Sequence, residues 1–143
     1  MEFVETLAHV MIKVSDLERS IAFYRDVLGF QEAFRIKRDD GTTGLIYMHV
    51  AGRQFVELSK GIEAEKASGR GVGYAHVCFE VADIQKAHER LLPSGAVVPE
   101  SLKVGRDGSW QFWIVDPDGN RIELMQYTRE SQQIKYLDSL GSE

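Results

Sequence analysis

Two segments of this 143-residue chain are similar to each other at a nearly constant offset. Ala8-His9-Val10 matches Ala75-His76-Val77, 67 positions later, and Val56-Glu57-Leu58 matches Ile122-Glu123-Leu124, 66 positions later. A one-residue deletion in a loop accounts for the change of offset. Because similarity at a fixed offset indicates a repeated supersecondary unit, we expect the chain to fold as two copies of one module.

The same order of elements is predicted in each copy. In the first copy, residues 7–14 alternate as a strand, and apolar residues recur at helical spacing from Leu17 to Leu28, between a candidate N-cap at Asp16 and a stop at Gly29. The other predicted elements are strands at 30–37, 45–50 and 54–59, then in the second copy strands at 74–81, 97–102, 110–115 and 121–127 with a helix at 83–92. The order β-α-β-β-β therefore occurs twice, which predicts an α+β fold.

A single domain is expected over residues 1–127. Module one spans about 6–60, module two about 74–127, and the polar, glycine-rich stretch 61–73 is the predicted linker. The tail, residues 128–143, is expected to be weakly helical and partly frayed.

Composition excludes several classes of protein. The formal net charge of −5, without an obvious basic face, disfavours nucleic-acid binding. No apolar run approaches the roughly 20 residues that span a bilayer, so no membrane association is expected. Residues 1–10 carry two Glu and no Lys or Arg, unlike a secretory signal. The one cysteine, Cys78, cannot form an internal disulfide, which favours the cytoplasm.

Alternation along the predicted strands separates the His and Glu residues from the core. Side chains two apart on a strand share a face, so His9 lies opposite the aliphatic positions next to it, as His76 does in the second copy. Glu57 and Glu123 likewise lie opposite the residues best suited to the core. Each copy therefore presents one imidazole and one carboxylate on the sheet face away from its helix.

The two ends of the repeat resemble a known family. The segment HVMIKVSDLERSIAFYRDVLGF, residues 9–30, resembles the opening of glyoxalase I, and DPDGNRIEL, residues 116–124, resembles its close. This resemblance covers about residues 7–127 and indicates the vicinal oxygen chelate superfamily. It implies tandem β-α-β-β-β modules that form a cupped mixed sheet, the glyoxalase/bleomycin-resistance/dioxygenase type of fold, around a divalent metal, often completed in a homodimer.

The resemblance implies four metal ligands: His9, Glu57, His76 and Glu123. Two imidazoles and two carboxylates suit one borderline divalent ion, such as Ni, Co, Zn, Mn or Fe. Such an ion can bind a small-molecule substrate with oxygens on neighbouring carbons and acidify a carbon-bound proton. By the same resemblance, Glu123 is the first choice for the base that removes this proton, and Glu57 is its mirror counterpart.

Other residues are candidates for substrate binding. Lys13 and Arg121 could anchor an anionic group, although a salt bridge between Lys13 and Glu80 is the favoured interpretation for Lys13. An apolar wall could come from Phe55, Trp113, Met125, Met11, Trp110 and Phe112, any of which could instead be core. The loop from Lys103 to Gly108 is a weaker candidate for a lid. Cys78 is expected to be a small buried residue near the metal, His88 to be solvated, and His49 to be structural or to line the cup.

The expected function is a glyoxalase I-type lyase or isomerase that enolises a thiol adduct of an α-ketoaldehyde. Glyoxalase I commonly has Arg where this chain has Lys13, and Asn where it has Gly61, so the resemblance leaves glutathione open as the thiol. Two alternatives remain: an epimerase acting on a CoA thioester, and a non-catalytic protein that binds an antibiotic or metabolite.

Overall fold

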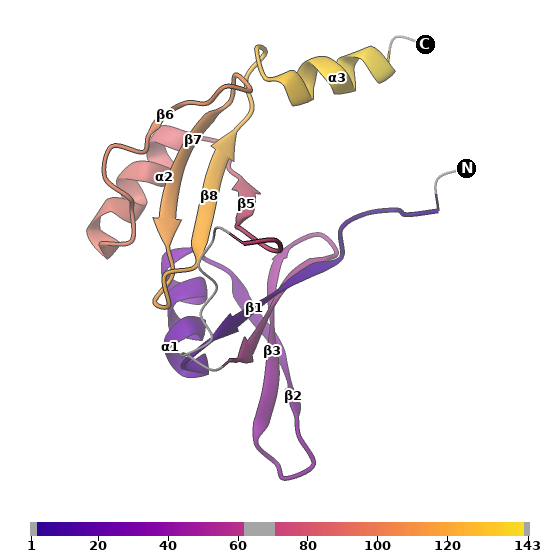
Figure 1. Cartoon of the computed structure of the whole chain (residues 1–143), viewed down its shortest axis with the longest axis vertical. Helices are drawn as coiled ribbons and strands as arrows, with labels where there is room; N and C mark the ends of the chain where they lie inside the picture. The colour runs from indigo at the N-terminus through magenta and orange to yellow at the C-terminus, as the bar shows by residue number, and fades with distance from the viewer. Residues whose placement is uncertain (1–2, 62–70, 142–143) are drawn as a thin grey trace. The chain divides into compact units, whose positions relative to one another are not determined.

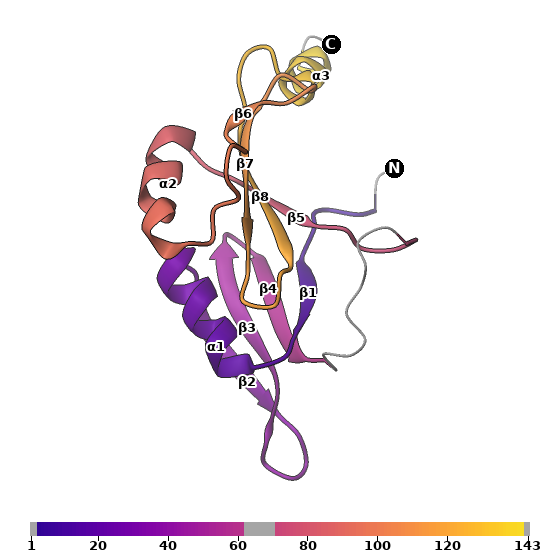
Figure 2. The ribbon, with the colours of Figure 1, turned by 60° about the vertical axis from the view of Figure 1, so that its left-hand side comes forward.

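The computed structural model describes residues 3–61 and 71–141, and the chain divides into two compact units, residues 1–71 and 72–143. Each unit contains one four-stranded sheet with a helix against one of its faces (Figures 1 and 2). The element order β-α-β-β-β is found in both units, which confirms the predicted α+β fold.

Apart from the strand expected at 97–102, the bounds of the elements lie close to the prediction. In chain order they are β1 His9–Val14, α1 Leu17–Ala22 continued by a π-helical turn Phe23–Val27, β2 Gln31–Lys37, β3 Thr43–Ala51, β4 Gln54–Lys60, β5 Val77–Glu80, α2 Ile84–Leu91 continued by a 3-10 turn Leu92–Ser94, β6 Lys103–Val104, β7 Trp110–Val115, β8 Arg121–Gln126 and α3 Gln132–Leu140.

The first unit has the strand order β1-β4-β3-β2, with β1 and β4 parallel and the other pairs antiparallel. Its core consists of Ile12, Val14, Ile21, Tyr24, Ile46, Met48, Val56 and Leu58. Along β1, Ile12 and Val14 are buried while His9, Met11 and Lys13 are exposed. The predicted assignment of faces on this strand is therefore confirmed.

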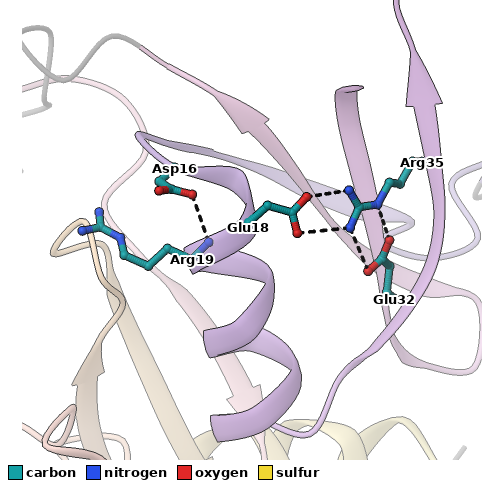
Figure 3. Close-up of polar contacts among 5 residues, drawn as sticks. All are labelled: Asp16, Glu18, Arg19, Glu32 and Arg35. Carbon is teal, nitrogen blue, oxygen red and sulfur yellow. Dashed lines mark hydrogen bonds and ion pairs between the residues drawn. The ribbon is translucent and has the colours of Figure 1, made fainter. Parts of the chain in front are cut away.

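The helix of the first unit is fixed at its start and along one side. The Asp16 carboxylate accepts a hydrogen bond from the Arg19 backbone N–H at 3.0 Å, so the predicted N-cap is confirmed. Arg35 on β2 forms ion pairs with Glu18 on α1, at 2.6 Å, and with Glu32 on its own strand (Figure 3). This bridge joins the helix to the outer strand of the sheet.

The second unit has the strand order β5-β8-β7-β6, with β5 and β8 parallel. Helix α2 packs on β7 and β8, and its N-terminus is capped by the Asp83 carboxylate. The core consists of Ile84, Leu91, Phe112, Ile114, Ile122 and Leu124. The turn before β8 is organised by the buried Asp116 carboxylate, which accepts hydrogen bonds from the backbone N–H groups of Asp118 and Asn120.

The predicted strand 97–102 is wrong. Only Val97 forms an isolated bridge, to Ile114, and the short strand β6 begins later, at Lys103. Pro99 has no backbone N–H to donate, and Glu100 adopts a left-handed conformation with φ of +58°, so the chain turns there. Of the predicted linker, residues 62–70 lie outside the described part of the chain.

The described part of the tail contains a helix, α3, as the prediction of helical character expected. Both views place it beyond the ends of β7 and β8 (Figures 1 and 2). The buried Ser131 hydroxyl precedes the helix and contacts the Ser109 hydroxyl at 2.8 Å. Among the residues described, no helix is long and apolar enough to cross a membrane.

Candidate metal centre

The first unit brings His9 and Glu57 together. His9 opens β1, and Glu57 lies at the centre of β4, where it is level with Met11 in the parallel ladder. The His9 Nε2 atom lies 3.2 Å from the Glu57 Oε2 atom. The imidazole is partly open to solvent and the carboxylate is almost fully buried, with 44% and 6% of their side-chain surfaces exposed.

Tyr47 contacts both members of this first pair. It is opposite Glu57 in the β3–β4 ladder, and its hydroxyl forms a hydrogen bond with the Glu57 carboxylate. This hydrogen bond to an anion is the main reason that the pKa of Tyr47 is raised, because ionisation of the phenol would remove the donor. The Tyr47 ring also meets the His9 ring edge-on, with 5.9 Å between centroids.

The second unit repeats the arrangement with His76 and Glu123. The His76 Nε2 atom lies 3.3 Å from the Glu123 Oε2 atom, and the carboxylate is again the more buried partner. His76 was predicted to lie within a strand, whereas it immediately precedes β5. Glu123 is on β8, level with Cys78 on one neighbouring strand and with Trp113 on the other.

The neighbours of the second pair differ from those of the first. Trp113 meets the His76 ring edge-on at 4.7 Å, and the Arg121 guanidinium lies over the Trp113 ring at 4.3 Å from its centroid. Cys78 is exposed, so the expectation that it is buried is wrong. Partial shielding of the sulfur, together with the nearby Glu123 charge, raises the pKa of the Cys78 thiol to about 12.

These two pairs suit a divalent metal in chemistry and spacing. Neighbouring ligand atoms on one ion, each about 2.1 Å from it, lie about 3 Å apart when they meet at a right angle. The two N–O distances, 3.2 Å and 3.3 Å, are close to that value. Within the described residues, each unit by itself offers two donors, and no group of three or more metal-ligating side chains occurs.

Comparison with known proteins now identifies the family. Residues 6–124 match the Glyoxalase/Bleomycin resistance protein/Dioxygenase superfamily, which accounts for most of the chain. The chain belongs to this superfamily. The resemblance to vicinal oxygen chelate proteins is therefore confirmed.

Several members of the superfamily are similar over nearly their full length. A lactoylglutathione lyase of Neisseria meningitidis is 29% identical over 134 aligned positions, which span 91% of this chain and 96% of that protein. A virulence protein of Salmonella typhimurium is 34% identical over 130 aligned positions, which span 87% of this chain and 85% of that protein. The crystal structure of a lactoylglutathione lyase from Agrobacterium tumefaciens matches with a TM-score of 0.66 at 25% identity, covering 87% of this chain and 96% of that one.

Within this superfamily fold, most of the other predicted site residues lie on the expected faces. Phe55 is on the face of Glu57, and Arg121 and Met125 are on the face of Glu123, by alternation along β4 and β8. Lys13 is exposed on the same strand as His9.

For two aromatic candidates the structure favours the core alternative over the apolar wall. Phe112 is fully buried on the helix side of its sheet, and Trp110 shares that side by alternation. His88, expected to be solvated, packs its ring edge-on against Phe112 at 5.1 Å. His49 contacts the Phe55 ring at 5.3 Å and the Gly52 carbonyl at 2.9 Å, so it has a local structural role.

The loop from Lys103 to Gly108 is tied down rather than poised as a lid. The Asp107 carboxylate accepts a hydrogen bond from the Gln133 side chain at 2.7 Å, and the Thr128 hydroxyl donates to the Gly108 carbonyl at 2.8 Å. Both contacts join the loop to the C-terminal segment.

Tyr47 is the contact residue that the sequence reasoning missed. The offset of 66 that relates Glu57 to Glu123 also relates Tyr47 to Trp113. Trp113 was chosen as a site residue from its aromatic character, and applying the repeat to it would have identified Tyr47.

Proposed function

We propose that the chain is a metal-dependent isomerase of the glyoxalase I type. The observation that carries this proposal is the duplicated His–Glu pair, which occurs at equivalent positions in both units at nearly equal distances. The lactoylglutathione lyase relatives support the same reaction class.

In this proposal, His9, Glu57, His76 and Glu123 together hold one divalent ion. When bound, the ion acts as a Lewis acid that makes the carbon-bound proton of a chelated substrate more acidic. The choice among Ni, Co, Zn, Mn and Fe remains open, because all of them accept nitrogen and carboxylate donors.

Glu123 is the proposed base. In the hemithioacetal of an α-ketoaldehyde, its carboxylate accepts the proton from the carbon that bears sulfur and hydroxyl. The proton then returns to the neighbouring carbon, while the hydroxyl proton passes from the first oxygen to the oxygen on that neighbouring carbon, which yields a 2-hydroxy thioester with no net gain or loss of atoms. Glu57 would remain one of the residues that hold the ion.

The remaining residues would orient the substrate. The Arg121 guanidinium, held over Trp113, supplies a fixed positive charge for an anionic group, and Lys13 supplies a second on β1. Phe55, Trp113 and Met125 supply apolar surface beside the two carboxylates. A homodimer and a cytoplasmic location stay predictions.

The test is turnover by metal-loaded protein. Methylglyoxal mixed with glutathione, and separately with other low-molecular-weight thiols, should be converted to thioester, measured by its ultraviolet absorbance. Glu123→Gln should lower kcat by about 10²–10⁴-fold, because a positioned base contributes that much. Glu89→Gln, on the exposed side of α2, is the matched control and should leave the rate unchanged.

Failure with every thiol would contradict the proposal. Proton exchange at a CoA thioester under the same conditions would support the epimerase instead. Tight binding of a small molecule without turnover, in protein that takes up no metal, would support a binding protein.

A further inference from the structure

The two half-sites are related by the repeat but differ in the group beside the carboxylate. Tyr47 faces Glu57 across the β3–β4 ladder, and Trp113 faces Glu123 across the β7–β8 ladder. The Tyr47 hydroxyl forms a hydrogen bond with Glu57, whereas Trp113 contacts His76 and carries Arg121. At equivalent positions of the repeat, the first half therefore has a phenol, and the second half has an indole ring with a guanidinium over it.

The Tyr47 ring is itself held in place. It stacks on Phe34 with 4.5 Å between centroids and 19° between planes, and it meets Phe55 edge-on at 5.9 Å. Together with the contact to His9, these rings surround Tyr47 on several sides. Because the Tyr47 ring is already constrained by its neighbours, its side chain loses little further rotamer freedom when the hydroxyl binds a carboxylate. The hydroxyl can therefore hold that carboxylate in one orientation.

We propose that Tyr47 is a positioning residue that holds Glu57 in the orientation of a permanent metal ligand. A carboxylate has lone pairs enough to accept the phenol hydrogen bond and bind a metal at the same time. Hydrogen bonds from outer groups to ligating carboxylates commonly change metal affinity by about 10–100-fold. This inference rests on the proposed function, since it concerns the same ion.

The difference between the half-sites also assigns roles to the two carboxylates. Glu57, held by Tyr47, would be the carboxylate that only holds the ion. Glu123 faces Trp113 instead of a phenol and has only the weakly donating Cys78 thiol beside it, so it would be the carboxylate that carries the proton.

The test measures Co²⁺ affinity by competition with a chromogenic chelator. Tyr47→Phe removes only the hydroxyl and should weaken Co²⁺ binding by about 10–100-fold. Tyr136→Phe removes the same hydroxyl from an exposed residue of α3 and should leave the affinity unchanged. In the Glu57→Gln background, Tyr47→Phe should change the affinity by less than about twofold, because the amide is no longer a strong ligand.

A spectroscopic readout separates positioning from general structural damage. The visible absorption of the Co²⁺-loaded protein should shift in Tyr47→Phe toward that of Glu57→Gln, while circular dichroism and the thermal midpoint stay near those of the Tyr136→Phe control. If Tyr47→Phe binds Co²⁺ with wild-type affinity, or loses as much affinity in the Glu57→Gln background as in the wild-type background, the role of Tyr47 is overturned and the proposed function is not. Wild-type protein that binds no Co²⁺ overturns the role of Tyr47 and the proposed function together.

Discussion

At the residue scale, the two buried carboxylates share a position but not an environment. Glu57 accepts a hydrogen bond from a phenol, and Glu123 lies beside a thiol that is a much weaker donor. A duplicated fold can therefore present two chemically distinct carboxylates at symmetric places. Such a distinction is what a reaction needs when one carboxylate binds and the other moves a proton.

The rate of alkylation of Cys78 measures the electrostatic environment beside Glu123. Alkylation requires the thiolate, and a pKa of about 12 keeps Cys78 protonated in the folded protein. The rate with iodoacetamide should therefore rise about tenfold per pH unit from pH 8 to 10, whereas in unfolded chain it levels off near the ordinary thiol pKa of about 8.5. Because this is the one cysteine, loss of free thiol measures the rate directly.

Glu123→Gln provides the control for this measurement. It removes the negative charge that opposes ionisation, so it should lower the pKa of Cys78 and speed alkylation at pH 9. A folded-state rate that levels off near pH 8.5 would contradict the shielded environment of Cys78.

At the element scale, the C-terminal segment is part of the second unit. Its contacts with the loop before β7 include the Ser131–Ser109 hydroxyl pair and the hydrogen bond from the Gln132 N–H to the Asp107 carbonyl at 2.7 Å. At Gly108, an added Cβ would lie 2.5 Å from the Glu130 carbonyl oxygen. The loop thus leaves no space for a side chain at this glycine.

Gly108→Ala should therefore destabilise the protein more than Gly119→Ala. Both glycines have positive φ, +88° and +83°, but a Cβ at Gly119 would meet no atom within 4 Å. Backbone strain is common to both, so the difference isolates the clash and should be about 1–3 kcal/mol in the free energy of unfolding. Urea denaturation measures it, and equal losses would show that the loop and tail are not in close contact.

Sequence reasoning succeeded for elements with a repeated pattern and failed where local chemistry differs between the copies. The helix cap at Asp16 and the face of β1 followed from residue type and alternation. The strand expected at 97–102 was lost because a proline and a left-handed glutamate interrupt it. The Ser101 hydroxyl then accepts a hydrogen bond from the Trp113 N–H and takes the place of strand pairing.

At the scale of the whole molecule, duplication made the candidate ligands recognisable but not their contacts. His9, Glu57, His76 and Glu123 could be selected because each has a counterpart at the repeat offset. The hydrogen bond of Tyr47 to Glu57 and the position of Arg121 over Trp113 depend on side-chain packing across neighbouring strands, which the offset does not encode. The contacts that distinguish the two halves were therefore the ones that required the structure.

The central claim is that both His–Glu pairs serve one ion, and metal stoichiometry tests it most directly. Elemental analysis of the metal-loaded, dialysed protein should give one divalent ion per chain. His9→Ala and His76→Ala each remove a partly exposed ligand, and either change should reduce the bound metal to near zero. Two ions per chain, with one retained in each variant, would show that the pairs are separate sites and would contradict the claim.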